Sequence, residues 1–556
     1  MGLWDLYFIT KLFLYFGQYM GFHAWPNLLF AAFLLVPVPE RYARKRLALV
    51  RQIIAMPVGI ALFYYDTWLP PISRAFSQAS AIEGFSGTYL LELLGRFFNP
   101  WVVAALVLVF AIYYFASKKL RISSFILVAM LAPLFSIGQG KPHPEVAQGG
   151  AGSAGAYQAA TATLSGPPSN EALNAQLQSF YAEEKQRAVS FPAPQKADAP
   201  FDILVLQVCS LSWDDIDYTH QDDNPLLQHF DIVFTDFSSA ASYSGPAAIR
   251  LLRGSCGQPA QPELYAPAPA ACELFDSLDR SGFRPELAMN HDGHFGDFLR
   301  DVRKYGDLQA PQFSNAGLQP YLQSFDGSPV FDDFGVLSKW WQQRLKSPAQ
   351  RVALFYNTIS LHDGNFYAGH RGTSRQIYPS RLDTLLKDLD RFLSVLQASG
   401  RRVVVVVIGE HGAAMRGDKL QVAGLREIPT PGISVVPVGI KLIGLPDTPG
   451  AKPLLVKRPT SYLALSQLLA NFITVPPFGN PKLTLADYTR DLPETGFVAE
   501  NEDVIVMRRG AQYFMRSKGD QWVQYQAPAA SISTMAPQAA ASAPSAPSAL
   551  STQNRE

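Results

Sequence analysis

The stretch VVVVVIGEHG, residues 403–412, decides the fold of this chain. Its unbroken apolar run predicts a strand that is buried on both faces, as the central strands of a parallel sheet are. The run stops at Gly409, and Glu410 and His411 follow at once. Open α/β sheets bind ligands at the carboxyl ends of their strands, and a carboxylate and an imidazole both bind zinc. The alternative is that Glu410 caps a helix and His411 is an ordinary loop residue.

Length and charge limit the possible classes of protein. The chain has 556 residues, too many for one ordinary domain, and its formal net charge is +1. A nucleic-acid partner is not expected, because no excess of basic residues is present to bind a phosphate backbone.

Residues 1–138 contain several long apolar runs and predict a helical membrane bundle of about five spans. The first run is the weakest, since it contains Lys11 and Gln18 and could lie in the membrane interface. No basic stretch precedes it, so a cleaved signal peptide is not expected. The predicted spans are 5–22, 25–39, 52–69, 99–116 and 122–138.

The short loops predict how the bundle is oriented. Basic residues are concentrated in loops 40–51 and 117–121, whereas the loop at about 70–98 has only Arg74 and Arg96. The positive-inside rule places the two basic loops in the cytoplasm. Everything after residue 138 then lies outside the inner membrane, which in a Gram-negative cell is the periplasm.

The rest of the chain predicts one α/β domain with flanking segments. Strand and helix patterns alternate from Phe201 to about Tyr525, which favours a central, mostly parallel sheet, and 503–525 resembles terminal antiparallel strands. Before this domain we expect a Gly/Ala/Pro/Ser-rich linker at 139–168 and a helix at 169–191. The predicted divisions are a bundle (1–138), a linker with one helix (139–200), a catalytic domain (201–526) and a disordered tail (527–556).

Three cysteines allow one disulfide and one free thiol. Cys209 ends the first apolar strand of the domain, where it could be a small buried residue, a disulfide partner or a metal ligand. Cys256 and Cys272 are 16 residues apart across a proline-rich loop and can close that loop. Cys209 would then be a free thiol that metal ligation protects.

Ser244 precedes Gly245 and Pro246, which begin a helical pattern through 249–252. It is either a plain helix N-cap or a nucleophile, because helix dipole and free amides favour an alkoxide and an incoming phosphate. Tyr243 could position that phosphate or simply pack. No histidine neighbours Ser244 in sequence, so a metal ion is the simpler activator of its hydroxyl.

Three further segments contain candidate polar residues. The strand in 351–365 ends at His362, which is either a structural histidine or a residue that acts as a general acid or base or binds phosphate oxygens. Arg426 could hold a phosphate through two donors, or could be a solvated arginine. The pair of histidines in HDGH, 291–294, is three residues apart beside Gly293, which favours a loop, and we rank it second.

Four segments resemble the alkaline phosphatase/sulfatase superfamily, and the bundle followed by a periplasmic domain resembles its phosphoethanolamine transferases, in particular those that modify cellulose. The resemblance covers nearly the whole chain except 527–556. The matching segments are VCSLSWDD (208–215), SYSGPAAIRLLRGSCGQ (242–258), NTISLHDGN (357–365) and GEHGAAMRGDKLQVAGLREIPTP (409–431).

The resemblance implies a zinc enzyme with a serine nucleophile. It implies that Ser244 is that nucleophile and also a zinc ligand, and that a disulfide joins Cys256 and Cys272. Lipid A-modifying relatives have a carboxylate and a threonine where this chain has Cys209 and Ser244, which favours cellulose as the acceptor. The other implied zinc ligands are Cys209, Glu410 and His411, and the implied phosphate-supporting residues are Tyr243, His362 and Arg426.

The implied reaction is a double displacement with phosphatidylethanolamine as donor and cellulose as acceptor, near subunits of the cellulose synthase or secretion complex. Two alternatives stay open. One is a lipid A transferase or a related phosphodiesterase or sulfatase; a sulfatase motif, however, needs an arginine where this chain has Ala248. The other is a non-catalytic membrane scaffold of the cellulose synthase, which need not keep zinc.

Overall fold

The computed structural model describes most of the chain in twelve ranges. Nearly all of the predicted linker (139–168) and the whole predicted tail (527–556) lie outside these ranges. The described residues are 4–17, 20–37, 44–67, 87–97, 100–118, 122–131, 168–193, 200–367, 373–446, 451–478, 483–517 and 521–526.

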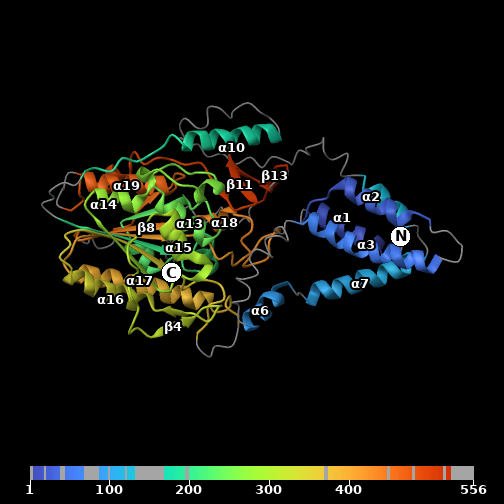
Figure 1. The fold of residues 1–556 in the computed structure, drawn as a ribbon, viewed down its shortest axis with the longest axis horizontal. Coiled ribbons are helices and arrows are strands. Elements are labelled where there is room, and N and C mark those ends of the chain that lie inside the picture. Colours follow the sequence, from blue (N-terminus) through green and yellow to red (C-terminus); the bar gives the residue numbers. More distant parts are fainter. Residues whose placement is uncertain are drawn as a thin grey trace, which may run out of the picture.

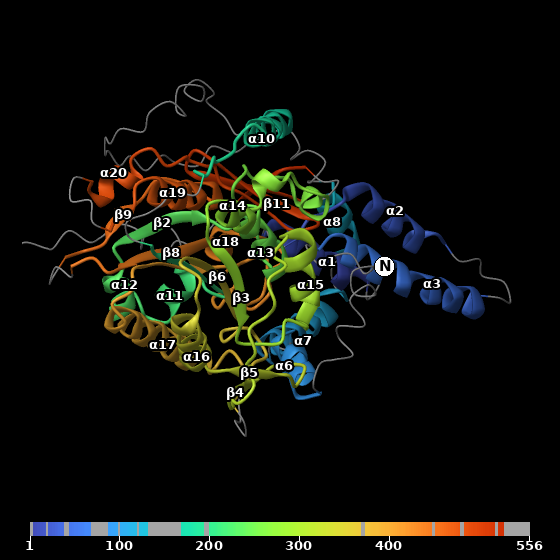
Figure 2. The ribbon, with the colours of Figure 1, turned by 60° about the vertical axis from the view of Figure 1, so that its left-hand side comes forward.

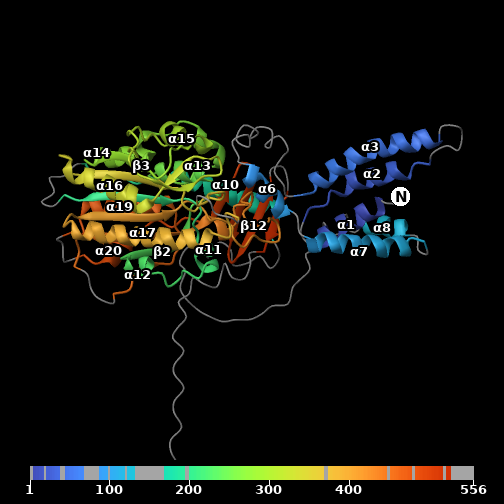
Figure 3. The ribbon, with the colours of Figure 1, turned by 90° about the horizontal axis from the view of Figure 1, so that it is seen from below.

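Helices form in all five predicted apolar segments and lie together beside the α/β part of the molecule (Figures 1 and 3). Judged by length and hydropathy together, none of the helices in the described ranges qualifies as a bilayer span. The five-span membrane region therefore stays a prediction. The helices are α1 (Trp4–Phe16), α2 (Ala24–Leu35), α3 (Arg44–Tyr65), α7 (Pro100–Ala116) and α8 (Ile122–Ala129).

Lys11 is one reason why the first apolar run is the weakest of the predicted spans. Its side chain is buried among these helices. Its ammonium lies 2.5 Å from Asp66 Oδ2 and donates to Asn27 Oδ1 at 2.7 Å. Asn27 Nδ2 also donates to Asp66 Oδ2, at 2.8 Å. A buried charge is tolerated only when it is paired and hydrogen-bonded, and this network supplies both conditions.

Helix α6 (Gly87–Phe97) forms in the stretch predicted as a loop and contacts the α/β part (Figure 1). The Tyr89 hydroxyl donates to Asp363 Oδ2 at 3.1 Å, and the Ser374 amide donates to Glu92 Oε2 at 3.1 Å. These bonds join the N-terminal region to the loop that follows strand β6 (Val352–Thr358).

The centre of the molecule is a seven-stranded sheet with the order β3-β6-β1-β7-β8-β2-β9. Only β8 is antiparallel to its neighbours, and β7 lies inside the sheet with all seven residues buried. The prediction of a mostly parallel sheet with 403–409 as a central strand is confirmed. The strands are β1 (Asp202–Val208), β2 (Ile232–Ser238), β3 (Arg284–Met289), β6 (Val352–Thr358), β7 (Val403–Gly409), β8 (Val435–Ile443) and β9 (Leu454–Val456).

Helices cover both faces of this sheet, as Figures 1 and 2 show. On one face pack α13 (Ser244–Leu252), α14 (Leu274–Arg280), α15 (Phe298–Tyr305) and α19 (Tyr462–Thr474). On the other face pack α11 (Trp213–Tyr218), α12 (Pro225–His229), α16 (Asp333–Lys346) and α17 (Tyr378–Ala398). Two apolar layers therefore pack against the two faces of the sheet, and the polar side chains that could bind a ligand lie at the strand ends.

A second, four-stranded antiparallel sheet carries α10 (Asn170–Glu184), seen above it in Figure 1. Leu173, Leu177 and Phe180 pack on this sheet, so the predicted helical face is confirmed, although the helix ends at Glu184. The predicted terminal antiparallel strands are also confirmed: β10 (Val498–Glu500), β11 (Val504–Arg509), β12 (Gln512–Ser517) and β13 (Val523–Tyr525). Minor elements are β4 (Pro320–Gln323), β5 (Pro329–Phe331), α18 (Pro431–Ser434), α20 (Leu485–Thr489) and 3-10 turns at Gln261–Tyr265, Ala270–Cys272 and Phe295–Asp297.

A disulfide joins Cys256 to Cys272, and Cys209 is a buried free thiol. Peptide mapping without reductant is expected to return the same linkage. Because the bond closes a 16-residue separation, reducing it is expected to lower the unfolding free energy by about 3 kcal/mol in denaturant titrations. A peptide that links Cys209 to either partner would contradict this assignment.

Candidate metal centre

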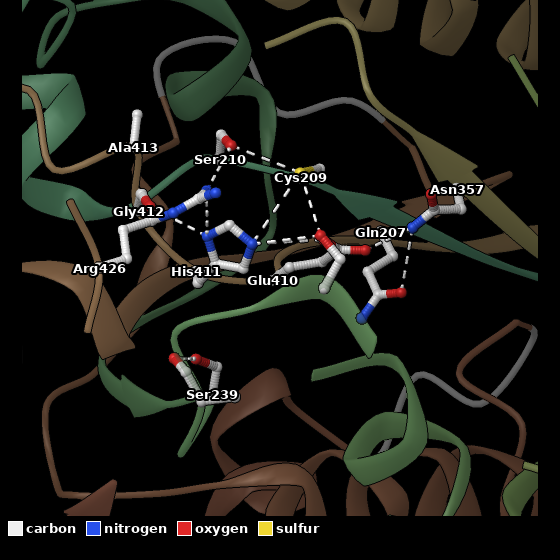
Figure 4. A network of polar contacts seen from close by, with 12 residues as sticks. Gln207, Cys209, Ser210, Ser239, Asn357, Glu410, His411, Gly412, Ala413 and Arg426 are labelled. Atoms are coloured by element: carbon white, nitrogen blue, oxygen red, sulfur yellow. Dashed lines mark hydrogen bonds and ion pairs between the residues drawn. The ribbon is translucent and has the colours of Figure 1, made fainter. Parts of the chain in front are cut away.

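Two adjacent strand ends bring the predicted ligands together. Strands β1 and β7 pair in register up to Val208 and Gly409, so Cys209 and Glu410 leave the sheet at the same edge. One ligand atom each from Cys209, Glu410 and His411 lies within 4.8 Å of the others, and all three residues are buried. Figure 4 shows the three side chains directed into one space, with Arg426 on one side and Asn357 on the other.

Ser244 faces this cluster from the first position of α13. Its Oγ lies 3.3 Å from Cys209 Sγ and 3.2 Å from His411 Nε2. The N-cap position belongs to Tyr243, so the interpretation of Ser244 as a plain N-cap is wrong. Its hydroxyl points to the sheet edge instead of to the helix amides.

The protonation of His411 suits a ligand. Its Nδ1 lies 2.9 Å from the Gly412 carbonyl oxygen, which can only accept, and 3.3 Å from Arg426 Nη1, which can only donate. The shorter of the two contacts favours the proton on Nδ1. Nε2 then keeps its lone pair and faces Ser244 and Cys209. Burial, with the charge of Arg426 second, holds the pKa of His411 well below its usual range and keeps the ring neutral.

Burial also favours the neutral forms of the other two groups. It raises the pKa of the Cys209 thiol to about 12, helped by Glu410, and it raises the pKa of Glu410 to about 7. Glu410 Oε2 has no hydrogen-bond partner in the described structure, although it is buried. A divalent cation would stabilise the Cys209 thiolate and the Glu410 carboxylate, and would therefore offset the energetic cost of ionising these two groups in a buried site.

The donor set therefore fits a metal ion. A thiolate, a carboxylate and a neutral imidazole are ligands that zinc prefers, and softer thiolate ligation disfavours magnesium and calcium. Ser244 Oγ is placed to complete a fourth position. This fit rests on one observation: the buried Glu410 Oε2 has no hydrogen-bond partner in the described structure.

Arg426 and Tyr243 border the cluster. Arg426 Nη1 donates to Ser210 Oγ at 3.2 Å and lies 3.3 Å from His411 Nδ1, while its guanidinium lies 5.4 Å from the Tyr243 ring centre. The Tyr243 hydroxyl donates to Glu427 Oε1 at 2.6 Å. Arg426 is therefore placed as a fixed positive charge beside the metal ligands, and Tyr243 is held by Glu427.

His362 is not at the end of its strand, which corrects the sequence prediction. Strand β6 stops at Thr358, and a turn closed by the His362 amide on the Ile359 carbonyl, at 2.8 Å, carries the chain to His362. Its Nδ1 lies 2.6 Å from the Asp363 carbonyl oxygen, and its ring packs against Phe295 and Phe325. Burial, followed by the charge of Arg426, lowers the pKa of His362 to about 4.

Three residues around the site were not predicted from the sequence, Gln207, Asn357 and Glu427, and a fourth, His291, was ranked second. Asn357 donates to Glu410 Oε1 at 2.5 Å and to Gln207 Oε1 at 3.3 Å. A signal was available, because Gln207 and Asn357 are each an uncharged polar residue near the end of an otherwise apolar buried strand. Such residues need a buried partner, which an apolar sheet does not supply.

A mostly parallel sheet with a thiol, a carboxylate and an imidazole at adjoining strand ends, and a serine facing them from a helix start, defines an alkaline-phosphatase-like α/β domain. Residues 157–522 match the family "Cellulose biosynthesis protein BcsG C-terminal domain", and residues 4–134 match the corresponding N-terminal domain. The chain belongs to the cellulose biosynthesis protein BcsG family.

Two relatives and two solved structures place this family membership in context. The chain is 42% identical to the cellulose biosynthesis protein BcsG of Escherichia coli and 40% identical to that of Salmonella typhimurium, over 94% of this chain and 96% of each relative. An alkaline phosphatase superfamily protein of Vibrio parahaemolyticus has a TM-score of 0.45 at 15% identity, covering 63% of this chain and 87% of its own. The lipooligosaccharide phosphoethanolamine transferase A of Neisseria meningitidis has a TM-score of 0.39 at 12% identity, covering 80% and 92%.

Proposed function

We propose that this chain is a zinc-dependent transferase that moves phosphoethanolamine from phosphatidylethanolamine to glucose hydroxyls of cellulose. The observation that carries the proposal is the Ser244 hydroxyl, held 3.3 Å from Cys209 Sγ and 3.2 Å from His411 Nε2 at the start of a helix. The name of the family, cellulose biosynthesis, supports the choice of acceptor. The resemblance of the sequence to phosphoethanolamine transferases supports the choice of the transferred group.

In the first half-reaction, Ser244 Oγ attacks the phosphorus of phosphatidylethanolamine. The Oγ–P bond forms, the bond from phosphorus to the diacylglycerol oxygen breaks, and the serine proton ends on that oxygen. The position of Ser244 at the start of α13 favours this attack. The positive end of the helix and its first backbone amides would lie beside the developing negative charge on the phosphate.

In the second half-reaction, a glucose hydroxyl of cellulose attacks the same phosphorus. Its oxygen bonds to phosphorus, the bond to Ser244 Oγ breaks, and the glucose proton returns the serine to its hydroxyl form. Two half-reactions through the enzyme avoid aligning a lipid donor and a polymer acceptor at once. Atoms and charge balance, since each step exchanges one phosphodiester for another.

Other residues hold the phosphoryl group and the ligands. Arg426 supplies positive charge for the phosphate oxygens, and Tyr243, fixed by Glu427, forms a wall beside it. His362, whose lowered pKa keeps its ring neutral near pH 7, is available as a proton acceptor for the incoming hydroxyl. Cys209, Glu410, His411 and Ser244 would hold the zinc ion, which would supply a Lewis acid for the phosphoryl and serine oxygens.

The proposed location is the bacterial inner membrane, with the catalytic domain in the periplasm near cellulose synthase or secretion subunits. The basic loops at 40–51 and 117–121 support this orientation. An alkaline phosphatase fusion at residue 160 is expected to be active, and a fusion at residue 45 to be inactive. An inactive fusion at residue 160 would overturn the topology.

The chemistry is tested with the full chain in vesicles that contain phosphatidylethanolamine but no acceptor. We expect diacylglycerol to be released and the peptide containing Ser244 to gain one phosphoethanolamine group. Release of free phosphoethanolamine without an acceptor would instead favour a phosphodiesterase. A purified chain that holds no zinc and releases no diacylglycerol would favour the scaffold alternative.

A further inference from the structure

The loop at 291–294 (HDGH) lies at the sheet edge that carries the candidate metal centre. Strand β3 ends at Met289, which pairs with Asn357 of the neighbouring strand β6, so the residues that follow β3 reach the same sheet edge as the ligands. His291 is buried there, and its Nε2 lies 2.9 Å from Asn357 Oδ1.

The backbone fixes which ring nitrogen of His291 carries the proton. The Gly293 amide donates to Nδ1 at 3.1 Å, so Nδ1 accepts and Nε2 holds the hydrogen of the neutral ring. Burial lowers the pKa of His291, which keeps the ring neutral. Gly293 is needed for this turn, because its φ is +74° and a Cβ would lie 2.7 Å from Met289 Cε.

The orientation of the Asn357 amide follows from that proton. Because His291 Nε2–H donates to Oδ1, the amide nitrogen must face the other way. There Nδ2 donates to Glu410 Oε1 at 2.5 Å and to Gln207 Oε1 at 3.3 Å. Glu410 Oε1 is therefore occupied, and Oε2 is the oxygen without a hydrogen-bond partner in the described structure.

We propose that His291 and Asn357 are positioning residues that orient the Glu410 carboxylate, holding Oε1 so that Oε2 is presented to a metal ion. The chain of donors runs one way, from the Gly293 amide through His291 and Asn357 to Glu410. The inference rests on the metal site of the proposed function, and it adds two residues to that site which do not touch the substrate or the metal.

The test measures zinc affinity of the purified full chain by competition with a coloured chelator. Asn357→Asp keeps the shape of the side chain but replaces the donor with a carboxylate, and should weaken zinc binding about 10- to 100-fold, as loss of an outer-shell partner usually does. His291→Ala should weaken it by a similar factor or less, because the amide can then turn its oxygen to Glu410. His291→Gln should restore affinity, since its amide nitrogen can take the place of Nε2.

A matched control separates orientation from folding. Asn290→Asp changes a buried asparagine at the same sheet edge, but Asn290 donates to Ser360 Oγ and the Phe331 carbonyl rather than to Glu410. It should lower the thermal midpoint of the zinc-free chain while leaving zinc affinity near that of the unmutated protein.

Three results would overturn the inference: unchanged zinc affinity in Asn357→Asp, equal losses in His291→Ala and His291→Gln, or an equal loss in Asn290→Asp. Failure of the proposed function looks different, because the unmutated chain would then bind zinc and release no diacylglycerol. A chain that binds no zinc at all would contradict both.

Discussion

Ser244→Ala is expected to abolish phosphoethanolamine transfer, with a loss of roughly 10⁴-fold or more, since removing a nucleophile leaves only the contribution of the remaining site. The fold should persist, because α13 is held by buried Ala248, Leu251 and Leu252 rather than by a cap from the serine. Diacylglycerol release and the thermal midpoint of the same preparation measure the two effects.

A serine two residues earlier provides the control. Ser242 is buried, and its Oγ has no hydrogen-bond partner in the described structure, so Ser242→Ala should leave transfer and stability nearly unchanged. If Ser244→Ala still modifies cellulose at a rate near that of the unmutated chain, the nucleophile assignment and the double displacement are both wrong.

Glu410→Gln is expected to remove most of the bound zinc and with it the transfer activity. Glutamine keeps the shape and the contact to Asn357 but loses the charge that the metal needs. The loss of affinity should exceed the 10- to 100-fold typical of an outer-shell partner. Glu427→Gln, which changes the acceptor of the Tyr243 hydroxyl, should retain zinc; equal zinc content in Glu410→Gln would contradict the assignment.

In the zinc-free chain, Glu410→Gln is expected to stabilise the fold at high pH. Burial raises the pKa of Glu410 from 4.5 to about 7, so the folded state binds this proton more tightly than the unfolded state. The zinc-free fold therefore loses stability as pH rises above 4.5, and the loss is complete above about 7. At pH 8 zinc-free Glu410→Gln should be more stable than the zinc-free unmutated chain, and at pH 4 the two should be alike; equal pH dependence would contradict this account.

Most of the fold could be read from local patterns, because a central parallel strand needs apolar residues on both faces. Residues 403–409 satisfy that condition, and the polar pair after them falls at the sheet edge. For Cys209, by contrast, the local sequence did not distinguish a buried residue, a disulfide partner and a metal ligand. Only the register of β1 against β7 places its sulfur near Glu410, and register is a long-range property.

The remaining errors have the same origin. The extent of β6 was overestimated because Ile359 and Leu361 continue an apolar pattern, although the chain already turns there. The prediction of a loop at 291–294 is confirmed, but the contact of His291 with Asn357 had no local signal, because the two residues are 66 apart in sequence. The contact between Tyr89 of α6 and Asp363 spans 274 residues and has no local signal.

The central claim is that this chain places phosphoethanolamine on cellulose. Solid-state phosphorus NMR of cellulose from otherwise identical cells, with the unmutated chain or with Ser244→Ala, tests it most directly. We predict a phosphodiester signal attached to glucose that is present with the unmutated chain and absent with Ser244→Ala. The same phosphorus signal in both samples, or no phosphodiester in either, would contradict the account.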